Sequence, residues 1–151
     1  MGKGKRKVAF DFDGVLNRVP DPFEYFMRHT HKEDILDRAG LYPLKIFFIR
    51  QIVARLPFIL DGEIFDKIDW KNQNHVISGR VEEREEVRKI LSKFPFYGIH
   101  MRNTVSVTES NYKRLTIERL GIAEYVEDRL SVIEDLKRAG INVKDVKRWK
   151  Q

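Results

Sequence analysis

The stretch Lys7-Val8-Ala9-Phe10-Asp11-Phe12-Asp13-Gly14-Val15-Leu16 decides the fold of this 151-residue chain. Its first half is an almost continuous apolar run, which is typical of a strand buried in a parallel sheet. Asp11 and Asp13 interrupt the run at its C-terminal end, and Gly14 allows a sharp turn there. Buried carboxylates are costly without a cation or hydrogen-bond donors, and open α/β sheets bind ligands beyond their strand ends. Capping of a turn would explain Asp13 but not Asp11, so the pair predicts a functional site.

A regular alternation of strands and helices is expected from residue 74 onward. The expected strands are 75–77, 96–101, 123–126 and 141–143, and helices are expected to begin near Glu82, Thr108 and Arg129. Thr108 is a suitable N-cap, and Gly121 and Gly140 are suitable helix ends. Five strands with crossing helices predict an α/β fold with a doubly wound parallel sheet.

The alternation is suspended between Asn17 and Lys71. Short helices are expected over 22–27, 33–39 and 43–56, so residues 17–72 are interpreted as a helical, cap-like insert within a single domain spanning 1–151. Three basic residues interrupt the most apolar of these helices too often for a membrane span: Lys45, Arg50 and Arg55. The apolar segment 44–60 fits a lid over the site or a dimer surface equally well, and the oligomeric state stays open.

Composition narrows the class of partner and the compartment. Lys and Arg exceed Asp and Glu by 29 to 23, for a formal net charge of +6, which favours an anionic partner: a phosphorylated metabolite, a nucleotide or a nucleic acid. The chain has no cysteine, so it has neither a disulfide framework nor a thiolate site, and a reducing cytoplasm is expected. The basic N-terminal residues are not followed by a long apolar segment, so no secretory signal is expected.

Polar residues follow the expected strands at the points where those strands end. Because the carboxyl ends of parallel strands lie along one edge of a sheet, these side chains are expected to converge although they are far apart in sequence. They are Asp11, Asp13, Ser78, Arg102, Glu127 and Asp128.

Four segments of this chain resemble, in order, the motifs of the haloacid dehalogenase (HAD) superfamily of phosphotransferases. The first is Asp11-Phe12-Asp13-Gly14-Val15-Leu16, the second Val76-Ile77-Ser78-Gly79-Arg80, the third Lys113, and the fourth Tyr125-Val126-Glu127-Asp128. The resemblance covers residues 7–143 with the insert unmatched. It implies a Rossmannoid sheet with the first-motif strand at its centre, and a small cap between the first and second motifs.

The resemblance implies a phosphatase that depends on Mg²⁺, which would screen the repulsion between a phosphate dianion and an anionic nucleophile. Asp11 would attack phosphorus, form an aspartyl-phosphate and ligate the metal. Asp13 would act as general acid and then base, while its main-chain carbonyl binds Mg²⁺. Asp128 would be the third protein ligand, and Glu127 would ligate through water or hold Lys113.

In this interpretation, residues of the second and third motifs bind the phosphate. Ser78 would donate a hydrogen bond to a phosphoryl oxygen, and Lys113 would neutralise charge on the transferring group. Each residue also has a plainer interpretation. Ser78-Gly79 suits a strand-to-helix turn, Arg114 is an alternative to Lys113, and Glu127 and Asp128 suit the cap of the following helix. His75 and His100 are expected to be core or edge residues.

Three basic residues near the motif positions indicate the class of substrate. Ser78-Gly79-Arg80, Arg102 and Glu127-Asp128-Arg129 resemble the phosphatase half of polynucleotide kinase/phosphatases, with Glu127 replacing the first Asp. That comparison assigns phosphate binding to Arg80 and Arg102, alongside Ser78, Gly79 and Lys113. No Gly-rich loop of a kinase module is present. A nucleic-acid 3′-phosphate or a nucleotide is therefore the expected substrate, with a sugar phosphate or an inactive regulatory scaffold as alternatives.

Overall fold

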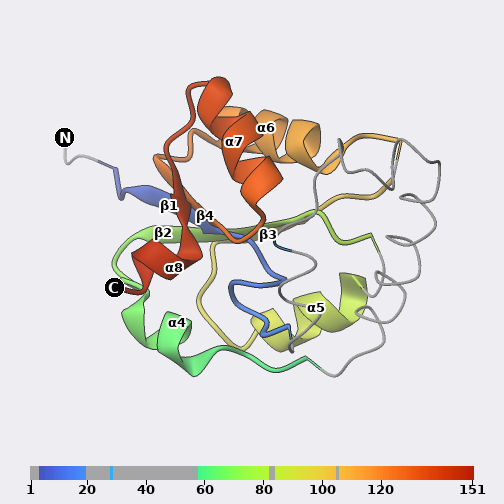
Figure 1. Cartoon of the computed structure of the whole chain (residues 1–151). Coiled ribbons are helices and arrows are strands. Elements are labelled where there is room, and N and C mark those ends of the chain that lie inside the picture. The colour runs from blue at the N-terminus through green and yellow to red at the C-terminus, as the bar shows by residue number, and fades with distance from the viewer. Residues whose placement is uncertain (1–3, 20–27, 29–57, 82–83, 105) are drawn as a thin grey trace.

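Five parallel strands in the order β3-β2-β1-β4-β5 form one sheet. The structure is a computed structural model that describes residues 4–19, 28, 58–81, 84–104 and 106–151. The strands are β1 (Lys7–Phe10), β2 (Gln73–Ser78), β3 (Gly98–Met101), β4 (Glu124–Glu127) and β5 (Val143–Asp145). The helices are α4 (Gly62–Lys67), α5 (Arg84–Leu91), α6 (Glu109–Leu120), α7 (Leu130–Arg138) and α8 (Val146–Trp149). This is the α/β arrangement with a Rossmann-like parallel sheet that the sequence predicts (Figure 1).

Strand β1 lies at the centre of the sheet. It pairs with β2 on one side, where Ala9 is opposite His75, and with β4 on the other, where Ala9 is opposite Tyr125. Val8, Ala9 and Phe10 are all buried, which explains why the strand is apolar at consecutive positions rather than at alternate ones. The chain leaves the sheet at Asp11, whose N–H donates to the Val126 carbonyl at 3.0 Å.

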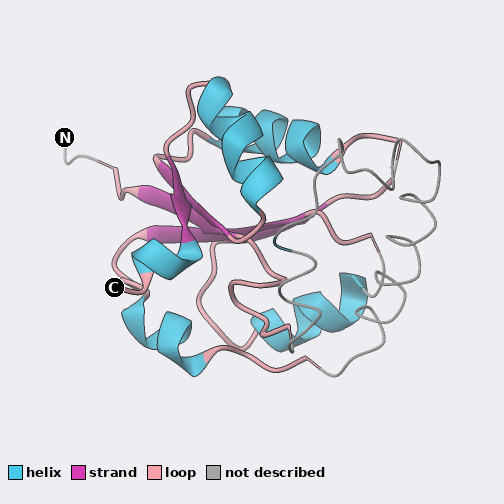
Figure 2. Ribbon diagram, viewed as in Figure 1, coloured by secondary structure: helices cyan, strands magenta, loops and turns pink. Residues whose placement is uncertain are grey.

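Helices cover both faces of the sheet (Figure 2). On one face, Val8 and Phe10 of β1 pack with apolar residues of α4, α5 and α8, among them Ile64, Leu91 and Val146. On the other face, a second apolar cluster joins the sheet to α6 and α7. Its buried members are Ala9, Ile77, Ile117, Tyr125, Val132, Ile133, Leu136 and Val143. Apolar side chains therefore cover both faces of the sheet, and polar groups lie at its carboxyl-end edge.

Several local predictions are confirmed and others are corrected. Thr108 is the N-cap of α6 through its bond to the Asn111 N–H, and Gly121 ends that helix in the left-handed conformation. The last strand is two residues later than predicted. Ile141 still donates to the Leu136 carbonyl at the end of α7, so pairing with β4 begins at Val143. Strand β3 likewise begins at Gly98 rather than at residue 96.

The segment predicted as an insert is described only at its two ends and at Arg28. The helices predicted over 22–27, 33–39 and 43–56 lie outside the described residues. Residues 58–72 contribute to the body of the domain: Asp61 caps α4, and Ile64 and Ile68 pack beneath the sheet. Asn17 pairs with Leu60 in an isolated antiparallel bridge, which brings the two ends of the segment together.

None of the helices in the described part of the chain has the length and apolar character needed to cross a membrane.

Candidate active site at the carboxyl edge of the sheet

The residues predicted to converge all lie at the carboxyl ends of the strands. Asp11 directly follows β1, Ser78 ends β2, Arg102 follows β3, and Glu127 ends β4. Because β2, β1 and β4 are adjacent and parallel, their ends share one edge of the sheet. Asp128 follows β4 at that edge and lies close to Gly14 in the loop after β1.

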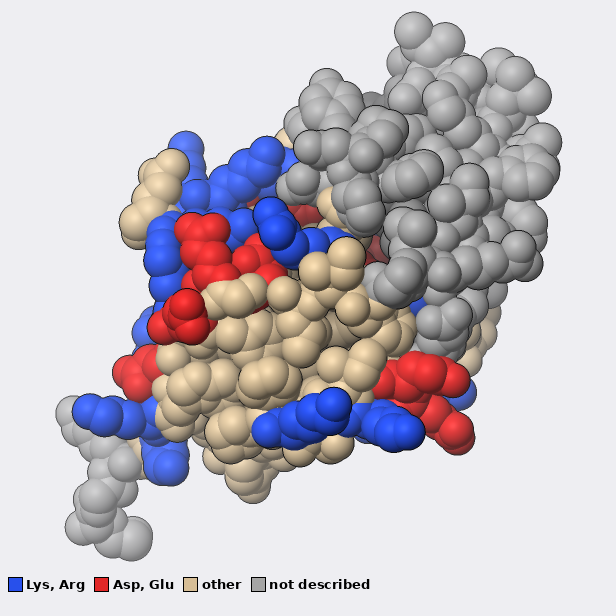
Figure 3. All heavy atoms as spheres, turned by 90° about the horizontal axis from the view of Figure 1, so that it is seen from below, with Lys and Arg blue, Asp and Glu red and all other residues tan. Residues whose placement is uncertain are grey.

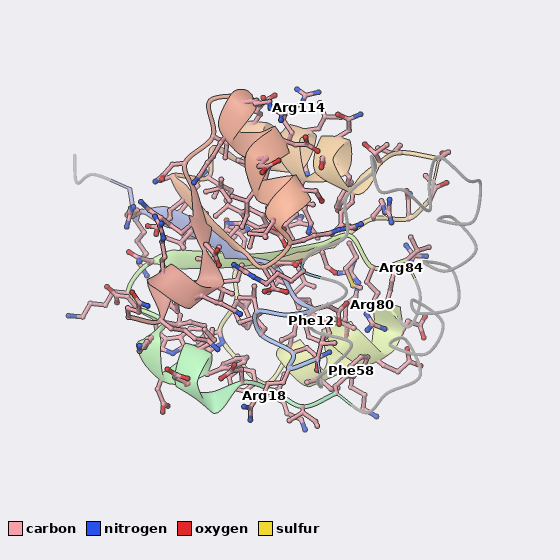
Figure 4. The ribbon with its side chains drawn as sticks, in the orientation of Figure 1. Phe12, Arg18, Phe58, Arg80, Arg84 and Arg114 are labelled. Atoms are coloured by element: carbon pink, nitrogen blue, oxygen red, sulfur yellow. The ribbon has the colours of Figure 1, made fainter. Side chains whose placement is uncertain are left out.

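Lys113 is at the centre of a buried cluster of carboxylates. It comes from α6, its side chain is fully buried, and its Nζ is 3.2 Å from Asp11 Oδ1. The same Nζ donates to Glu127 Oε2 and to Glu109 Oε1, both at 2.7 Å. Arg114 points away from this cluster, at the top of Figure 4, and pairs with Glu118 at 3.5 Å on the surface. Lys113 is therefore the basic residue that contacts Asp11, and Arg114 is not.

The electrostatics of this cluster follow from burial and charge. Burial, with the neighbouring Glu127 carboxylate, raises the pKa of Asp11 well above its usual value, and Lys113 offsets only part of that effect. Burial opposes the charged form of Lys113 as well, but Asp11, Glu109 and Glu127 outweigh it and raise the pKa of Lys113. The lysine is therefore fixed as a cation, while Asp11 needs additional positive charge to be stable as a carboxylate.

Glu127 has all of its acceptor positions occupied by donors of the protein. Its Oε1 accepts from the main-chain N–H groups of Asp128 (3.0 Å) and Arg129 (3.1 Å). Its Oε2 accepts from Lys113 and from the Tyr125 hydroxyl, which is 2.9 Å away. The expected contact of Glu127 with Lys113 is therefore present, and Glu127 also accepts hydrogen bonds from the first N–H groups after β4. Its role as a metal ligand stays a prediction.

Asp13 is held by two neighbours at the mouth of the site. Arg80 donates to both of its carboxylate oxygens, from Nε to Oδ2 and from Nη2 to Oδ1, each at 2.9 Å. Asn17 donates its side-chain N–H to Oδ1, also at 2.9 Å. The Arg80 guanidinium lies over the rings of Phe58 and Phe12, which Figure 4 shows grouped around it. Arg80 was predicted to bind phosphate, and its present partner is the predicted general acid.

Gly14 allows Asp128 to approach the loop after β1. Gly14 has a φ of 84°, and a Cβ on it would lie only 2.3 Å from Asp128 Oδ2. A residue with a side chain would therefore be strained in its backbone and would also fill the space next to this carboxylate. Gly14 thus allows both the turn and the approach of the Asp128 carboxylate to the loop that carries Asp11 and Asp13.

The Ser78-Gly79 turn is tightly packed. Ser78 Oγ accepts from the Arg80 N–H at 3.1 Å, and Arg102 donates from Nε to the Gly79 carbonyl at 2.9 Å. A Cβ on Gly79 would lie 2.6 Å from the Glu109 side chain, so a larger residue there would displace Glu109. Arg102 also donates to the Val107 carbonyl at 2.8 Å, which joins two loops at the edge of the sheet. Phosphate binding by Ser78, Gly79 and Arg102 stays a prediction.

The donor set suits a hard divalent cation. Oxygens of Asp11, Glu109 and Glu127 lie within 4.8 Å of one another, but Lys113 bonds all three carboxylates, so this trio is the binding site of the lysine. The residues predicted to hold Mg²⁺ are Asp11, the Asp13 carbonyl and Asp128, with Glu127 as a ligand through water, and all of them offer oxygen atoms. Burial and the Glu127 carboxylate raise the pKa of Asp11, so a cation beside Asp11 would favour its charged form. Asp128 Oδ2 lies against Gly14, in the loop that carries the Asp13 carbonyl.

Three residues of this network were missed from the sequence. Glu109 bridges Lys113 and Arg129, with 2.8 Å to Arg129 Nη1, and its spacing of four before Lys113 was a readable indication. The buried Tyr125 hydroxyl donates a hydrogen bond to Glu127 Oε2. Arg28 contacts Asp128, which is 100 residues away, and no local pattern indicates such a contact.

Figure 3 shows one face of the molecule with its charged side chains. There, Lys and Arg lie along the margins of a broad area of uncharged residues and alternate with Asp and Glu. Several arginines instead lie inward, in contact with carboxylates and main-chain carbonyls of the site.

Comparison of the chain with family models, curated proteins and solved structures gives no match.

Proposed function

We propose that this chain is a Mg²⁺-dependent phosphomonoester hydrolase of the haloacid dehalogenase type, with Asp11 as its nucleophile. The observation that carries the proposal is the 3.2 Å contact between Lys113 Nζ and Asp11 Oδ1, both buried at the carboxyl end of the central strand. A carboxylate that attacks a phosphate dianion needs fixed positive charge nearby to offset their repulsion. Asp11, Glu109 and Glu127 hold the Lys113 ammonium beside Asp11, which supports this role for Lys113.

Asp11, the main-chain carbonyl of Asp13 and Asp128 would hold the Mg²⁺. When bound, the ion neutralises charge on the transferring phosphoryl group and favours the ionised form of a ligating carboxylate. This matters for Asp11 in particular, because burial and Glu127 raise its pKa well above the usual range. Glu127, which is saturated by donors, would hold Lys113 and the start of the fourth-motif loop.

The reaction would proceed in two displacements at phosphorus. In the first, an Asp11 carboxylate oxygen attacks phosphorus, the bond from phosphorus to the leaving oxygen breaks, and Asp13 gives that oxygen a proton. In the second, Asp13 takes a proton from water, whose oxygen attacks the aspartyl-phosphate. The bond between phosphorus and the Asp11 oxygen then breaks, which regenerates the Asp11 carboxylate and the protonated Asp13 and releases inorganic phosphate.

Arg80 would change partners during this cycle. A carboxylate bonded through both oxygens to a guanidinium has no proton to give, so the present Asp13–Arg80 pair fits the state in which Asp13 accepts a proton. When a substrate binds, Arg80 would transfer its N–H groups to phosphoryl oxygens, and Asp13 would then be available as the acid. In this proposal Arg80 has two states: it bonds Asp13 in one and binds a phosphoryl group in the other.

The proposed substrate is a nucleic-acid 3′-phosphate or a nucleotide. Its support is the set of arginines at the strand ends, Arg80, Arg102 and Arg129, together with the net charge of +6. A polyphosphorylated chain offers additional anionic groups to a basic protein, which a small sugar phosphate does not.

The test measures inorganic phosphate released from an aryl phosphate with and without Mg²⁺, by wild type and by Asp11→Asn. Asp66→Asn, an exposed aspartate of α4, is the matched control. We expect turnover that requires Mg²⁺, is abolished in Asp11→Asn and is unchanged in Asp66→Asn. A 3′-phosphorylated oligonucleotide and panels of nucleotide and sugar monophosphates then rank the substrates. Folded wild type that binds Mg²⁺ but turns over none of them would indicate a regulatory scaffold instead.

A further inference from the structure

Arg28 connects two strand ends on the far side of the site from Arg80. It is the one residue between 20 and 57 that the structure describes, and it is buried, with 7% of its surface exposed. Its Nη1 donates to the main-chain carbonyl of Asp128 at 2.8 Å, to Asp128 Oδ1 at 3.2 Å and to Asp145 Oδ1 at 2.9 Å. Its Nη2 donates to the second oxygen of Asp145.

Asp145 is built to hold this guanidinium in place. It ends β5, the neighbour of β4, and its Oδ1 also accepts from the Lys147 N–H as the N-cap of α8. Although burial opposes its charge, the hydrogen bonds from Arg28 and the Lys147 N–H lower the pKa of Asp145. The guanidinium of Arg28 is thus fixed on one side by the carboxylate of Asp145.

The two carboxylate oxygens of Asp128 have different neighbours. Arg28 bonds Oδ1, while Oδ2 lies against Gly14, in the loop that carries the Asp13 carbonyl. Arg28 also bonds the Asp128 carbonyl, so it fixes both the backbone and the side chain of this residue. The bonds to Asp145 hold the Arg28 guanidinium at the end of β5, and its bonds to Asp128 connect it to the loop after β4.

We propose that Arg28, held by Asp145, is a positioning residue that turns Asp128 Oδ2 toward the Asp13–Gly14 loop for binding of a divalent cation. This inference rests on the proposed function, because it concerns the Mg²⁺ site of the same reaction. Groups that orient a metal ligand without touching the metal typically account for 10-fold to 100-fold in metal affinity. It also links the metal loop to a residue of the segment that the sequence predicts to be an insert.

The test compares Mg²⁺ affinity, by calorimetric titration of the full chain with Mg²⁺ alone, in wild type, Arg28→Ala, Arg28→Lys and Asp145→Asn. Glu124→Gln is the matched control, because it breaks the 2.8 Å ion pair with Arg6 at the opposite end of β4. We expect the Kd for Mg²⁺ to rise about 10-fold or more in Arg28→Ala and by less in Arg28→Lys and Asp145→Asn. Glu124→Gln is expected to bind like wild type. If Arg28→Ala fails to fold, Asp145→Asn carries the test.

Kinetics separate positioning from a merely structural role. In the positioning role, the Mg²⁺ concentration for half-maximal phosphate release rises about 10-fold, and kcat recovers when Mg²⁺ is saturating. A structural role would lower kcat at every Mg²⁺ concentration in proportion to the protein unfolded.

Equal Mg²⁺ affinity in Arg28→Ala and wild type would overturn the positioning role of Arg28 without contradicting the proposed phosphatase activity. Wild type that does not bind Mg²⁺ would overturn it as well. Weakened Mg²⁺ binding in the Arg28 variants of a protein that releases no phosphate would sustain the positioning role and reject the proposed function.

Discussion

The Arg80 guanidinium bonds both carboxylate oxygens of Asp13, with Nε 2.9 Å from Oδ2 and Nη2 2.9 Å from Oδ1. Asp13 comes from the loop after β1 and Arg80 from the turn after β2, so the pair ties together two adjacent strand ends. The arginine is almost completely buried and its partner is only partly so, which leaves Asp13 open to a ligand from the solvent side.

The geometry of this pair predicts that lysine cannot replace arginine at position 80. Arg80→Lys keeps the charge but loses the two parallel hydrogen bonds, both to Asp13 and to a phosphoryl group. We expect kcat/KM for phosphate release to fall at least about 10-fold, which corresponds to about 1.4 kcal/mol of transition-state stabilisation. Arg84→Lys, at the exposed first residue of α5, is the control and should be neutral. Equal kinetics in the two variants would remove Arg80 from the mechanism.

Gly14 and Gly121 offer a matched pair of left-handed glycines. Gly121 has a φ of 70° and nothing within 4 Å of an added Cβ, whereas at Gly14 the Cβ would meet Asp128. We expect Gly121→Ala to lower the free energy of unfolding by about 1–2 kcal/mol, the usual strain of a left-handed residue, and Gly14→Ala to lower it further. Mg²⁺ binding should weaken only in Gly14→Ala. Urea unfolding and Mg²⁺ titration check this, and indistinguishable variants would argue against the Gly14–Asp128 approach.

Lys113 is predicted to hold the site together as well as to act in it. Lys113→Met leaves Asp11 and Glu127 buried without their common cation, while Glu109 keeps Arg129, so the free energy of unfolding should fall by about 3–5 kcal/mol. Arg114→Met removes the neighbouring exposed cation and should cost less than about 0.5 kcal/mol. Adding Glu127→Gln to Lys113→Met should recover part of the loss. A small effect of Lys113→Met in urea unfolding would contradict the buried network.

The pair His75 and His100 predicts a loss of stability in mild acid. His75 Nδ1 is 3.2 Å from His100 Nε2, and burial, with His100 and Lys7 nearby, lowers the pKa of His75 from about 6.5 to about 4. Between those values the unfolded chain binds a proton that the folded one does not, so stability falls as the pH falls from 6.5 to 4. The slope is up to about 1.4 kcal/mol per pH unit. Urea unfolding at pH 7, 6 and 5 should show a shallower slope for His75→Gln than for wild type. Parallel slopes would show that His75 titrates normally.

The fold was predictable to the extent that its determinants are local. The apolar run before Asp11 identifies the central strand, and Thr108 and Gly121 identify the limits of α6, because caps depend on the nearest residues. Helices α4 and α8 were missed because they are short and are stabilised mainly by burying Ile64 and Val146 under a sheet that the local sequence does not reveal.

The site was predictable in position but not in its contacts. The parallel order of the strands places Asp11, Ser78, Arg102 and Glu127 at one edge, which the sequence pattern was enough to indicate. It does not say which groups bond there. Arg102 bonds main-chain carbonyls, and Arg28 contacts Asp128 across 100 residues of chain. Such partners depend on tertiary packing, which no spacing encodes.

The most direct test of the central claim is to locate the phosphoryl group during turnover. Wild type is mixed with an aryl phosphate and Mg²⁺, quenched in acid within the first turnover, and digested for peptide mass spectrometry. The account predicts a phosphoryl adduct on Asp11, present in Asp66→Asn and absent in Asp11→Asn or when Mg²⁺ is left out. Phosphate release that continues in Asp11→Asn, or an adduct on another residue, would contradict it.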